Sequence, residues 1–518
     1  MSDTVPEALS IRRPCFITTP IYYVNDRPHI GHAYTSLAAD VLARWRRLQG
    51  REVFLLTGTD EHGQKVEKAA KDAGMDPQAF CDRVSQHFRD LVGVMGLSTD
   101  DFIRTTEDRH KQACAALWDK LVAKGEIYLG HYEGWYAVRD EAFYGPDELT
   151  ERDGVKYAPS GAPVEWVREP SYFFRLSAWQ DRLLAFYDAN PDFILPASRR
   201  NEVIAFVKSG LGDLSISRTS FTWGVKVPGD PAHVMYVWLD ALTNYITAAG
   251  YPADPAAFAK WWPADIHFVG KDIVRFHAIY WPAFLMAADL APPHRVFAHG
   301  WWTNEGQKIS KSLGNVIDPV GLVEEFGLDP IRYFLLREVP FGQDGDFSRA
   351  ALIGRNNGEL ANALGNLANR TLSLIQKNCG ASLPPPAART AGEGTLGPLV
   401  DALPAQVAAH LDRQEFHLAL EAVMAAAREA NGYITEQAPW ALKKTDPVRG
   451  EAVLRQLHDA LRVFATVLQP FMPTTMAKLL DQLGVPEGAR GLGDLATPLP
   501  AGLPLPPPAP LFAKIETA

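Results

Sequence analysis

Two histidines near the start of the chain have a spacing that suits phosphate chemistry. His29 and His32 lie on either side of Gly31, and apolar residues recur at helical spacing from Tyr34 onward. The first amides of a helix have no partner within it and carry the positive end of its dipole, so they can bind phosphate. The imidazoles would add donors without a fixed charge, and the glycine permits close approach. We expect a phosphate site here, although histidines that only cap the helix would leave the same four letters.

A second group of polar residues lies in the stretch KISKS. Lys308 and Lys311 are three residues apart, with Ser310 between them, on a loop that also contains glycine. Two ammonium groups on such a loop can reach over a triphosphate and offset the charge that develops during attack at phosphorus. Alone, a loop of this kind is usually a solvated basic turn. Whether these lysines have a function therefore depends on whether they lie close to the two histidines in the fold.

Short apolar runs predict the strands that would position both groups. We interpret four runs as strands, at residues 15–20, 52–58, 266–272 and 295–300. Between the first two, the pattern predicts an amphipathic helix that ends near Gly50. In a parallel sheet with helical connections, ligands bind at the carboxyl ends of the strands. The two histidines, Asp60 in TGTDEHG and the KISKS loop all follow such strands, so we expect them at one edge of the sheet.

The predicted strands fall into two groups far apart in the sequence, which indicates a split domain. The predicted fold is α/β: a Rossmann-type parallel sheet with an inserted connective domain, followed by an all-α helix bundle. The two longest predicted helices are 355–377 and 415–436. The predicted domains are 1–117 and 225–328 for the two halves of the sheet domain, 118–224 for the insertion, and 329–518 for the helical domain with its Pro-rich tail.

Composition indicates an ordinary soluble protein. The chain has 518 residues, is 47% hydrophobic and 22% charged, and its formal net charge of −10 argues against wholesale binding to a polyanion. Its four cysteines form no CxxC pair, so neither a disulfide framework nor a zinc knuckle is predicted. The first residues lack an apolar signal segment, and no membrane-spanning apolar run follows. We expect a cytoplasmic monomer that binds neither membranes nor DNA.

The two polar groups, in this order and about a domain apart, resemble the HIGH and KMSKS signatures of the class I aminoacyl-tRNA synthetases. The chain is most similar to the methionyl-tRNA synthetases, from Cys15 to about Pro319, in TTPIYYVNDRPHIGHAYT, GTDEHGQK, DLSISR, YVWLDALTNY, FVGKDIVRFHAIYWPAFL and KISKSLGNVIDP. The resemblance implies that methionine carboxylate attacks the α-phosphate of ATP, which is accompanied by Mg²⁺. The methionyl group then passes from the adenylate to methionine tRNA, including the initiator. The implied catalytic residues are His29, His32, Lys308 and Lys311, and Gly31 and Ser310 would join them in binding ATP.

The resemblance also implies a pocket for methionine. Such a pocket needs an unbranched apolar slot, and the polarizable thioether gains from aromatic edges. The matching positions are Ile21, Tyr23, Trp238, Ala241, Tyr245, Ile273 and His277. Tyr23 and His277 could point a donor at the sulfur, and Asp60 supplies a carboxylate for the α-ammonium group. Each side chain could equally belong to a core, but together they favour a pocket. Homocysteine should compete, because one methylene is worth only about 1–3 kcal/mol.

The predicted insertion departs from many relatives, which carry zinc knuckles there. Residues 118–224 contain no cysteine. Asp140, Glu141 and Glu148 lack the His and Cys spacing of a tetrahedral zinc site. We therefore expect no structural zinc and a resemblance to the metal-free branch of the family. Aromatic packing would replace the metal, by Trp135, Tyr136, Tyr144 and Trp166.

Three residues of the helical domain match the family's anticodon-reading motif. Asn366 and Arg370 are one helical turn apart beside a leucine stripe, and Trp440 follows Pro439. The first two could reach an unstacked base and the tryptophan could stack on another. The alternatives are a solvated helix face and a core tryptophan. Two other protein classes also fit part of the chain: a non-catalytic tRNA-binding paralogue would not need the ATP motifs, and a nucleotidyltransferase for a small metabolite would not need the helical domain.

Overall fold

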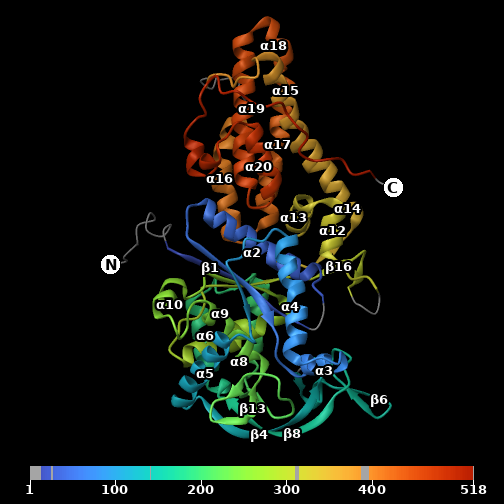
Figure 1. The fold of residues 1–518 in the computed structure, drawn as a ribbon, viewed down its shortest axis with the longest axis vertical. Helices are drawn as coiled ribbons and strands as arrows, with labels where there is room; N and C mark the ends of the chain where they lie inside the picture. Colours follow the sequence, from blue (N-terminus) through green and yellow to red (C-terminus); the bar gives the residue numbers. More distant parts are fainter. Residues whose placement is uncertain (1–12, 25–26, 141, 310–313, 387–395, 517–518) are drawn as a thin grey trace.

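The computed structural model describes residues 13–516 except 25–26, 141, 310–313 and 387–395. An α/β part and a helical part are stacked along the long axis of the molecule (Figure 1). The predicted strands and helix bundle are both present, so the predicted fold class is confirmed. None of the helices in the described part of the chain combines the length and hydropathy needed to cross a bilayer.

A six-stranded sheet forms the centre of the α/β part. Its order is β3-β2-β1-β14-β15-β9, and every neighbouring pair is parallel. The strands are β1 (Cys15–Tyr23), β2 (Val53–Asp60), β3 (Asp101–Arg104), β9 (Ile194–Leu195), β14 (Ile266–Gly270) and β15 (Val296–His299). Phe16 and Ile17, on opposite faces of β1, are both fully buried. Burial on both faces explains why these strands are continuous apolar runs in the sequence.

Helices cover the sheet and connect its strands. The crossover from β1 to β2 is α2 (Ile30–Leu48), as predicted, and Gly50 follows it with a φ of 80°. The other helices of the α/β part are α3 (Gln64–Asp72), α4 (Pro77–Val94), α5 (Asp108–Ala123), α6 (Gln180–Ala189), α7 (Ala197–Lys208), α8 (Val237–Leu242), α9 (Asn244–Ala248), α10 (Pro255–Trp261) and α11 (Trp281–Ala287). A π-helical segment, Phe276–Tyr280, precedes α11.

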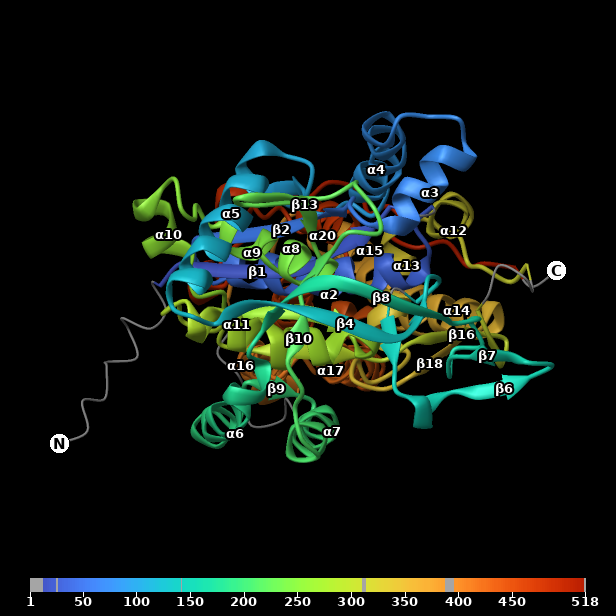
Figure 2. The ribbon, with the colours of Figure 1, turned by 90° about the horizontal axis from the view of Figure 1, so that it is seen from below.

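The inserted region forms antiparallel strands at the bottom of the view in Figure 1, and these strands lie toward the viewer in Figure 2. One sheet has the order β10-β8-β4-β5, with β4 (Ile127–Ala137), β5 (Ala142–Tyr144), β8 (Glu165–Phe174) and β10 (Leu214–Ser215). A hairpin of β6 (Thr150–Arg152) and β7 (Val155–Tyr157) projects from it, and β11 (Ser217–Arg218), β12 (Lys226–Val227) and β13 (Asp230–Met235) form a third sheet. Between these strands the chain returns once to the main sheet as β9. The predicted domain limits remain predictions.

The helical part begins after β17 (Gln307–Lys308), which forms a small sheet with β16 (Trp302–Asn304) and with β18 (Gly345–Phe347), a strand that follows α13 (Leu328–Arg337). Its helices are α12 (Pro319–Phe326), α13 (Leu328–Arg337), α14 (Arg349–Arg355), α15 (Asn366–Asn378), α16 (Leu396–Asp412), α17 (Phe416–Gln437), α18 (Pro439–Thr445), α19 (Pro447–Leu468) and α20 (Pro473–Gln482). The predicted helix 355–377 is divided, because residues 356–365 between α14 and α15 are π-helical. This segment contains Gly358 and Gly365, which have low α-helix propensity.

The two parts share one hydrophobic core, which runs from β1 and α2 through α13 to α20. At its centre the Arg332 guanidinium lies 2.7 Å from the Asp40 carboxylate, and both side chains are fully buried. Arg332 also donates to the carbonyl oxygens of Met95, Pro470 and Phe471. Burial raises the pKa of Asp40, but Arg332 and Arg44 more than offset this and hold it below its usual value. One side chain thus joins α2, the end of α4 and the turn before α20.

Candidate active site at the carboxyl edge of the parallel sheet

The strands of the central sheet end together at the edge where the sequence predicted a site. Tyr23 at the end of β1 is paired with Asp60 at the end of β2, and Gly270 at the end of β14 is paired with His299 at the end of β15. The strand order reverses between β1 and β14, which is the usual position of a ligand crevice in such sheets. The sheet therefore has the geometry that is needed for the predicted site residues to meet at this edge.

His29 and His32 cap helix α2 with their own side chains. The Gly31 N–H donates to Nδ1 of His29 over 3.1 Å, and the His29 N–H donates to Nδ1 of His32 over 3.0 Å. Burial lowers the pKa of both imidazoles, and for His32 the neighbouring His29 lowers it further. A neutral ring whose Nδ1 accepts must carry its hydrogen on Nε2. The capping arrangement and the phosphate-binding arrangement are therefore compatible, because capping leaves one N–H donor on each ring.

Asp272 lies near His29 and is a further candidate for the site, which the sequence analysis quoted in FVGKD but did not assign. It follows the carboxyl end of β14, and its carboxylate acts on His29 by raising the pKa that burial lowers. The Trp301 indole N–H donates to Asp272 over 3.2 Å, and Lys271 forms an ion pair of 2.6 Å with Asp344. The position of Asp272, just after a strand of the parallel sheet, was the signal in the sequence that could have identified it.

The base of the KISKS loop contacts the first turn of α2. The Ile30 N–H donates to the carbonyl oxygen of Ile317 over 3.1 Å, so the end of the loop lies at the HIGH-like turn. At the start of the loop, the backbone of Lys308 is in β17, paired with Thr303 of β16. Lys311 and Ser310 lie outside the described residues. The described residue Ile317, which follows the loop, therefore lies at the edge of the sheet where α2 begins.

Four predicted pocket residues share one hydrophobic cluster: Ile21, Trp238, Tyr245 and Ile273. Trp238 stacks face to face on Phe276, a residue that the sequence analysis did not assign. Ala241 is one turn after Trp238 on α8 and is buried. Tyr23 packs in a neighbouring cluster, and Asp60, opposite it, is only 6% exposed. The structure thus brings a cluster of apolar side chains and a carboxylate to the same end of the sheet.

His277 has both ring nitrogens engaged. Its Nδ1 lies 3.0 Å from the carbonyl oxygen of Ile273, and its Nε2 lies 2.7 Å from the Tyr245 hydroxyl. Burial lowers the pKa of His277 to about 4, so at neutral pH the ring has one N–H. A carbonyl can only accept, so that hydrogen lies on Nδ1 and Tyr245 donates to Nε2. The expectation that His277 points a donor at a sulfur atom is therefore wrong in this arrangement, and Tyr23 remains the candidate donor.

The three candidate anticodon residues are neighbours in the helical part. Asn366 and Arg370 are exposed on α15, beside the buried Leu364 and Leu367 of the leucine stripe. The Arg370 guanidinium lies 6.0 Å from the ring centre of Trp440 on α18, and Trp440 is 47% exposed. Trp440 is therefore not the core residue that the alternative required. Helix α18 lies at the end of the molecule remote from the sheet (Figure 1).

Family models match both parts of the chain. A model of the class I tRNA synthetases (M) matches residues 15–372, and a model of the anticodon binding domain of methionyl tRNA ligase matches residues 383–518. The chain belongs to the methionyl-tRNA synthetase family. It is therefore an aminoacyl-tRNA synthetase that ligates methionine to tRNA. Trp440 lies within the second match, whereas Asn366 and Arg370 lie in the first.

Individual relatives agree with the family models over almost the full chain. The methionine–tRNA ligase of Rickettsia conorii is 58% identical over 511 residues, which is 97% of this chain and 99% of the relative. The methionine–tRNA ligase of Brucella suis is 54% identical and covers 98% of this chain and 99% of the relative. The structure of Mycobacterium tuberculosis methionyl-tRNA synthetase in complex with methionyl-adenylate has a TM-score of 0.94 and 49% identity, with 96% of this chain and 99% of that chain covered.

Proposed function

We propose that the carboxyl edge of the sheet activates methionine with ATP and that α15 and α18 read the anticodon of the tRNA. Methionine carboxylate attacks the α-phosphate, and pyrophosphate leaves. The terminal ribose hydroxyl of the tRNA then takes the methionyl group from the adenylate. No side chain has to form a covalent bond, so positioning and charge stabilisation supply the rate.

One observation carries the ATP half of the proposal: the hydrogen bond from the Ile30 amide to the Ile317 carbonyl. This bond supports a triphosphate site between the HIGH-like turn and the KISKS loop. On one side His29 and His32 would donate from Nε2, with Gly31 leaving room for the nucleotide. On the other side Lys308, Ser310 and Lys311 would contact the phosphates. ATP would enter with Mg²⁺ as part of the substrate.

The methionine half of the proposal rests on the apolar cluster at the same end of the sheet as Asp60. The Asp60 carboxylate would bind the α-ammonium group, and Tyr23 would face the sulfur. The walls would be Ile21, Trp238, Ala241, Tyr245, Ile273 and His277. The stack of Trp238 on Phe276 and the bond between Tyr245 and His277 support walls that are ordered before the ligand binds, which reduces the entropic cost of binding.

We also propose that the enzyme is a cytoplasmic monomer without structural zinc and that it charges the initiator tRNA. Within the described part of the inserted region, Asp140 accepts hydrogen bonds from the hydroxyls of Tyr144 and Ser160. Trp135 and Trp166, paired across β4 and β8, pack edge to face. These contacts support packing in place of a metal. Stoichiometric zinc in purified protein would overturn this part of the proposal.

The lysine loop can be tested by separating methionine activation from methionine binding. Lys311→Ala should lower the rate of methionine-dependent ATP–pyrophosphate exchange by at least about 100-fold, in line with the loss of one preorganised charge contact in a transition state. The methionine Kd should stay within about two-fold, since this loop is proposed to contact phosphate. Lys478→Ala, an exposed lysine on α20, is the matched control. Equal losses of exchange and methionine affinity would contradict the assignment.

A further inference from the structure

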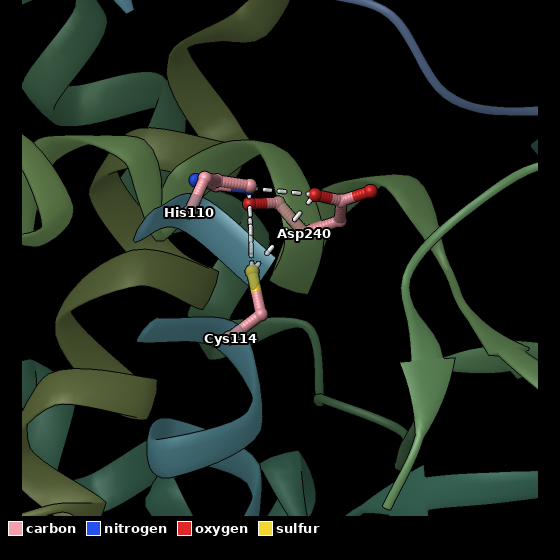
Figure 3. Close-up of side chains that lie close together, drawn as sticks. All are labelled: His110, Cys114 and Asp240. Atoms are coloured by element: carbon pink, nitrogen blue, oxygen red, sulfur yellow. Dashed lines mark hydrogen bonds and ion pairs between the residues drawn. The ribbon is translucent and has the colours of Figure 1, made fainter. Parts of the chain in front are cut away.

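A buried polar cluster joins α8 to the segment at the end of β2, and both of these contain residues of the proposed methionine pocket. The Asp240 carboxylate on α8 is 1% exposed, and its two oxygens contact two histidines. Oδ2 lies 2.7 Å from Nδ1 of His62, and Oδ1 lies 2.7 Å from Nε2 of His110 on α5. Figure 3 shows His110 and Asp240 together with Cys114, whose sulfur is 3.3 Å from His110 Nε2. Both histidines are buried as well.

The cluster keeps a carboxylate ionised in the protein interior. Burial raises the pKa of Asp240, but His62 and His110 more than reverse this and bring it well below its usual value. A buried charge is tolerated only when its oxygens are occupied by donors in good geometry. Asp240 meets this condition because each of its two oxygens has its own imidazole. The carboxylate therefore cannot turn without breaking at least one of these bonds.

The spacing of the cluster indicates hydrogen bonding and not metal coordination. His110, Cys114 and Asp240 are the one group of three potential metal ligands among the described residues. A tetrahedral zinc ion would hold a nitrogen and an oxygen about 3.3 Å apart, whereas His110 and Asp240 are 2.7 Å apart. To bind zinc, Cys114 would also have to be a thiolate. Burial and the nearby Asp240 raise the pKa of Cys114 well above its usual value, so its thiol stays protonated.

The position of the cluster in the chain links it to both walls of the pocket. Asp240 lies between Trp238 and Ala241 on α8, and His62 is two residues after Asp60. The bond from His62 to Asp240 therefore joins the helix that would contact the methionine side chain to the segment that would bind its ammonium group. The two residues are 178 positions apart in the sequence, so no local structure would hold these walls together.

The segment after β2 is also fixed from its other side. Glu61, between Asp60 and His62, is fully buried and accepts two hydrogen bonds from Arg104, over 2.7 Å and 2.9 Å. The hydroxyl of Thr106 donates to the same carboxylate over 2.6 Å. Glu61 thus fixes the segment to the loop before α5, and His62 fixes it to α8. Because the two residues that follow it are held, Asp60 has little freedom to follow a ligand of the wrong length.

We propose that Asp240 is a positioning residue that sets the distance between the two ends of the methionine pocket, with His62 as the link and His110 as the group that fixes the carboxylate orientation. The proposal rests on the assignment of Asp60, Trp238 and Ala241 to methionine. Its consequence is selectivity by length. When the bond from His62 to Asp240 fixes the distance between Asp60 and α8, the pocket fits the ammonium group and the thioether of methionine at that distance. When the bond is lost, the pocket should lose affinity for methionine and accept homocysteine more readily.

The test measures methionine, homocysteine and ATP kinetics in pyrophosphate exchange for Asp240→Asn and His62→Asn. Asp240→Asn keeps the shape of the side chain but replaces one acceptor by an amide, and His62→Asn breaks the link from the other wall. Both should raise KM for methionine at least about ten-fold, a misplacement effect, while KM for ATP changes less than about two-fold. The preference for methionine over homocysteine should fall at least about three-fold. Cys114→Ala is the matched control: it removes the sulfur contact to His110 and the long sulfur contacts to Asp240, of 3.8 Å and 3.9 Å, and leaves the bonds from His62 and His110 to Asp240 in place, so it should leave all three values unchanged.

A role in folding alone predicts a different result. It would lower the active fraction, measured by titration of the adenylate formed in a single turnover, and leave KM and selectivity unchanged; that result would overturn the proposal. Failure of the pocket assignment is separately visible in Asp60→Asn. If Asp60→Asn binds methionine normally, the proposed pocket is wrong. If Asp60→Asn loses methionine binding while the Asp240 and His62 variants keep normal KM and selectivity, only the positioning role is wrong.

Discussion

Substitutions of Trp440 should separate the proposed recognition of the tRNA from chemistry at the sheet. Stacking of one base on an aromatic side chain is worth about 1–3 kcal/mol, which corresponds to about 5- to 150-fold in an equilibrium constant. Trp440 is half exposed and has the Arg370 guanidinium nearby, so its free face is available to a base. We therefore expect Trp440→Ala to lower kcat/KM for methionine tRNA by this factor. Pyrophosphate exchange without tRNA should be unchanged.

A stability effect has to be separated from the effect on recognition. About half of the indole surface is buried, roughly 100 Å², which contributes about 2.5 kcal/mol to folding. Trp440→Leu restores most of that apolar contact but has no aromatic face. It should therefore recover thermal stability without recovering tRNA charging.

The matched control for Trp440 lies on the preceding helix. Leu418→Ala removes a 38% exposed side chain about 28 Å away along α17 and should leave charging intact. If Trp440→Ala and Trp440→Leu both charge tRNA like the wild type, the reasoning about the anticodon face is refuted.

Two further predictions concern stability. Arg332→Met leaves the buried Asp40 carboxylate without its main partner and should lower the free energy of unfolding by about 3–5 kcal/mol in urea titrations. The double variant with Asp40→Leu should recover part of that loss, and a single-variant loss below about 1 kcal/mol would contradict the role given to the pair. The second prediction concerns His277, whose pKa is lowered to about 4 in the folded state against 6.5 in an unfolded chain. This histidine favours folding fully above pH 6.5, and the contribution is lost as the pH falls from 6.5 toward 4, by roughly 3 kcal/mol in total. His277→Gln should show a shallower fall in unfolding free energy over this window, and an identical pH profile for both proteins would refute the assignment.

Features that depend only on the local sequence pattern were predicted well. The strands β1, β2, β14 and β15 are buried on both faces and therefore appear as short continuous apolar runs. The helix from Ile30 was visible from its periodicity and from Gly50 at its end. For His29 and His32, the sequence left capping and phosphate binding as alternatives. The geometry makes them compatible, because capping through Nδ1 leaves Nε2 as a donor.

Features that depend on long-range pairing could not be predicted. The bond from His62 to Asp240 joins residues far apart in the chain, and no periodicity or motif marks it. The donor role expected of His277 failed for a similar reason, because it depended on which atoms face its two nitrogens in the fold. Asp272 was overlooked although its place after a strand was visible in the sequence.

The buried contact between Arg332 and Asp40 has a consequence for the substrate. A single continuous core carries α2 and the far helices together, so we expect the distance from the sheet edge to the tip at α18 to change little when a substrate binds. If a tRNA contacts the sheet edge and α18 at once, as proposed above, any change of shape needed for both contacts would fall mainly on the nucleic acid.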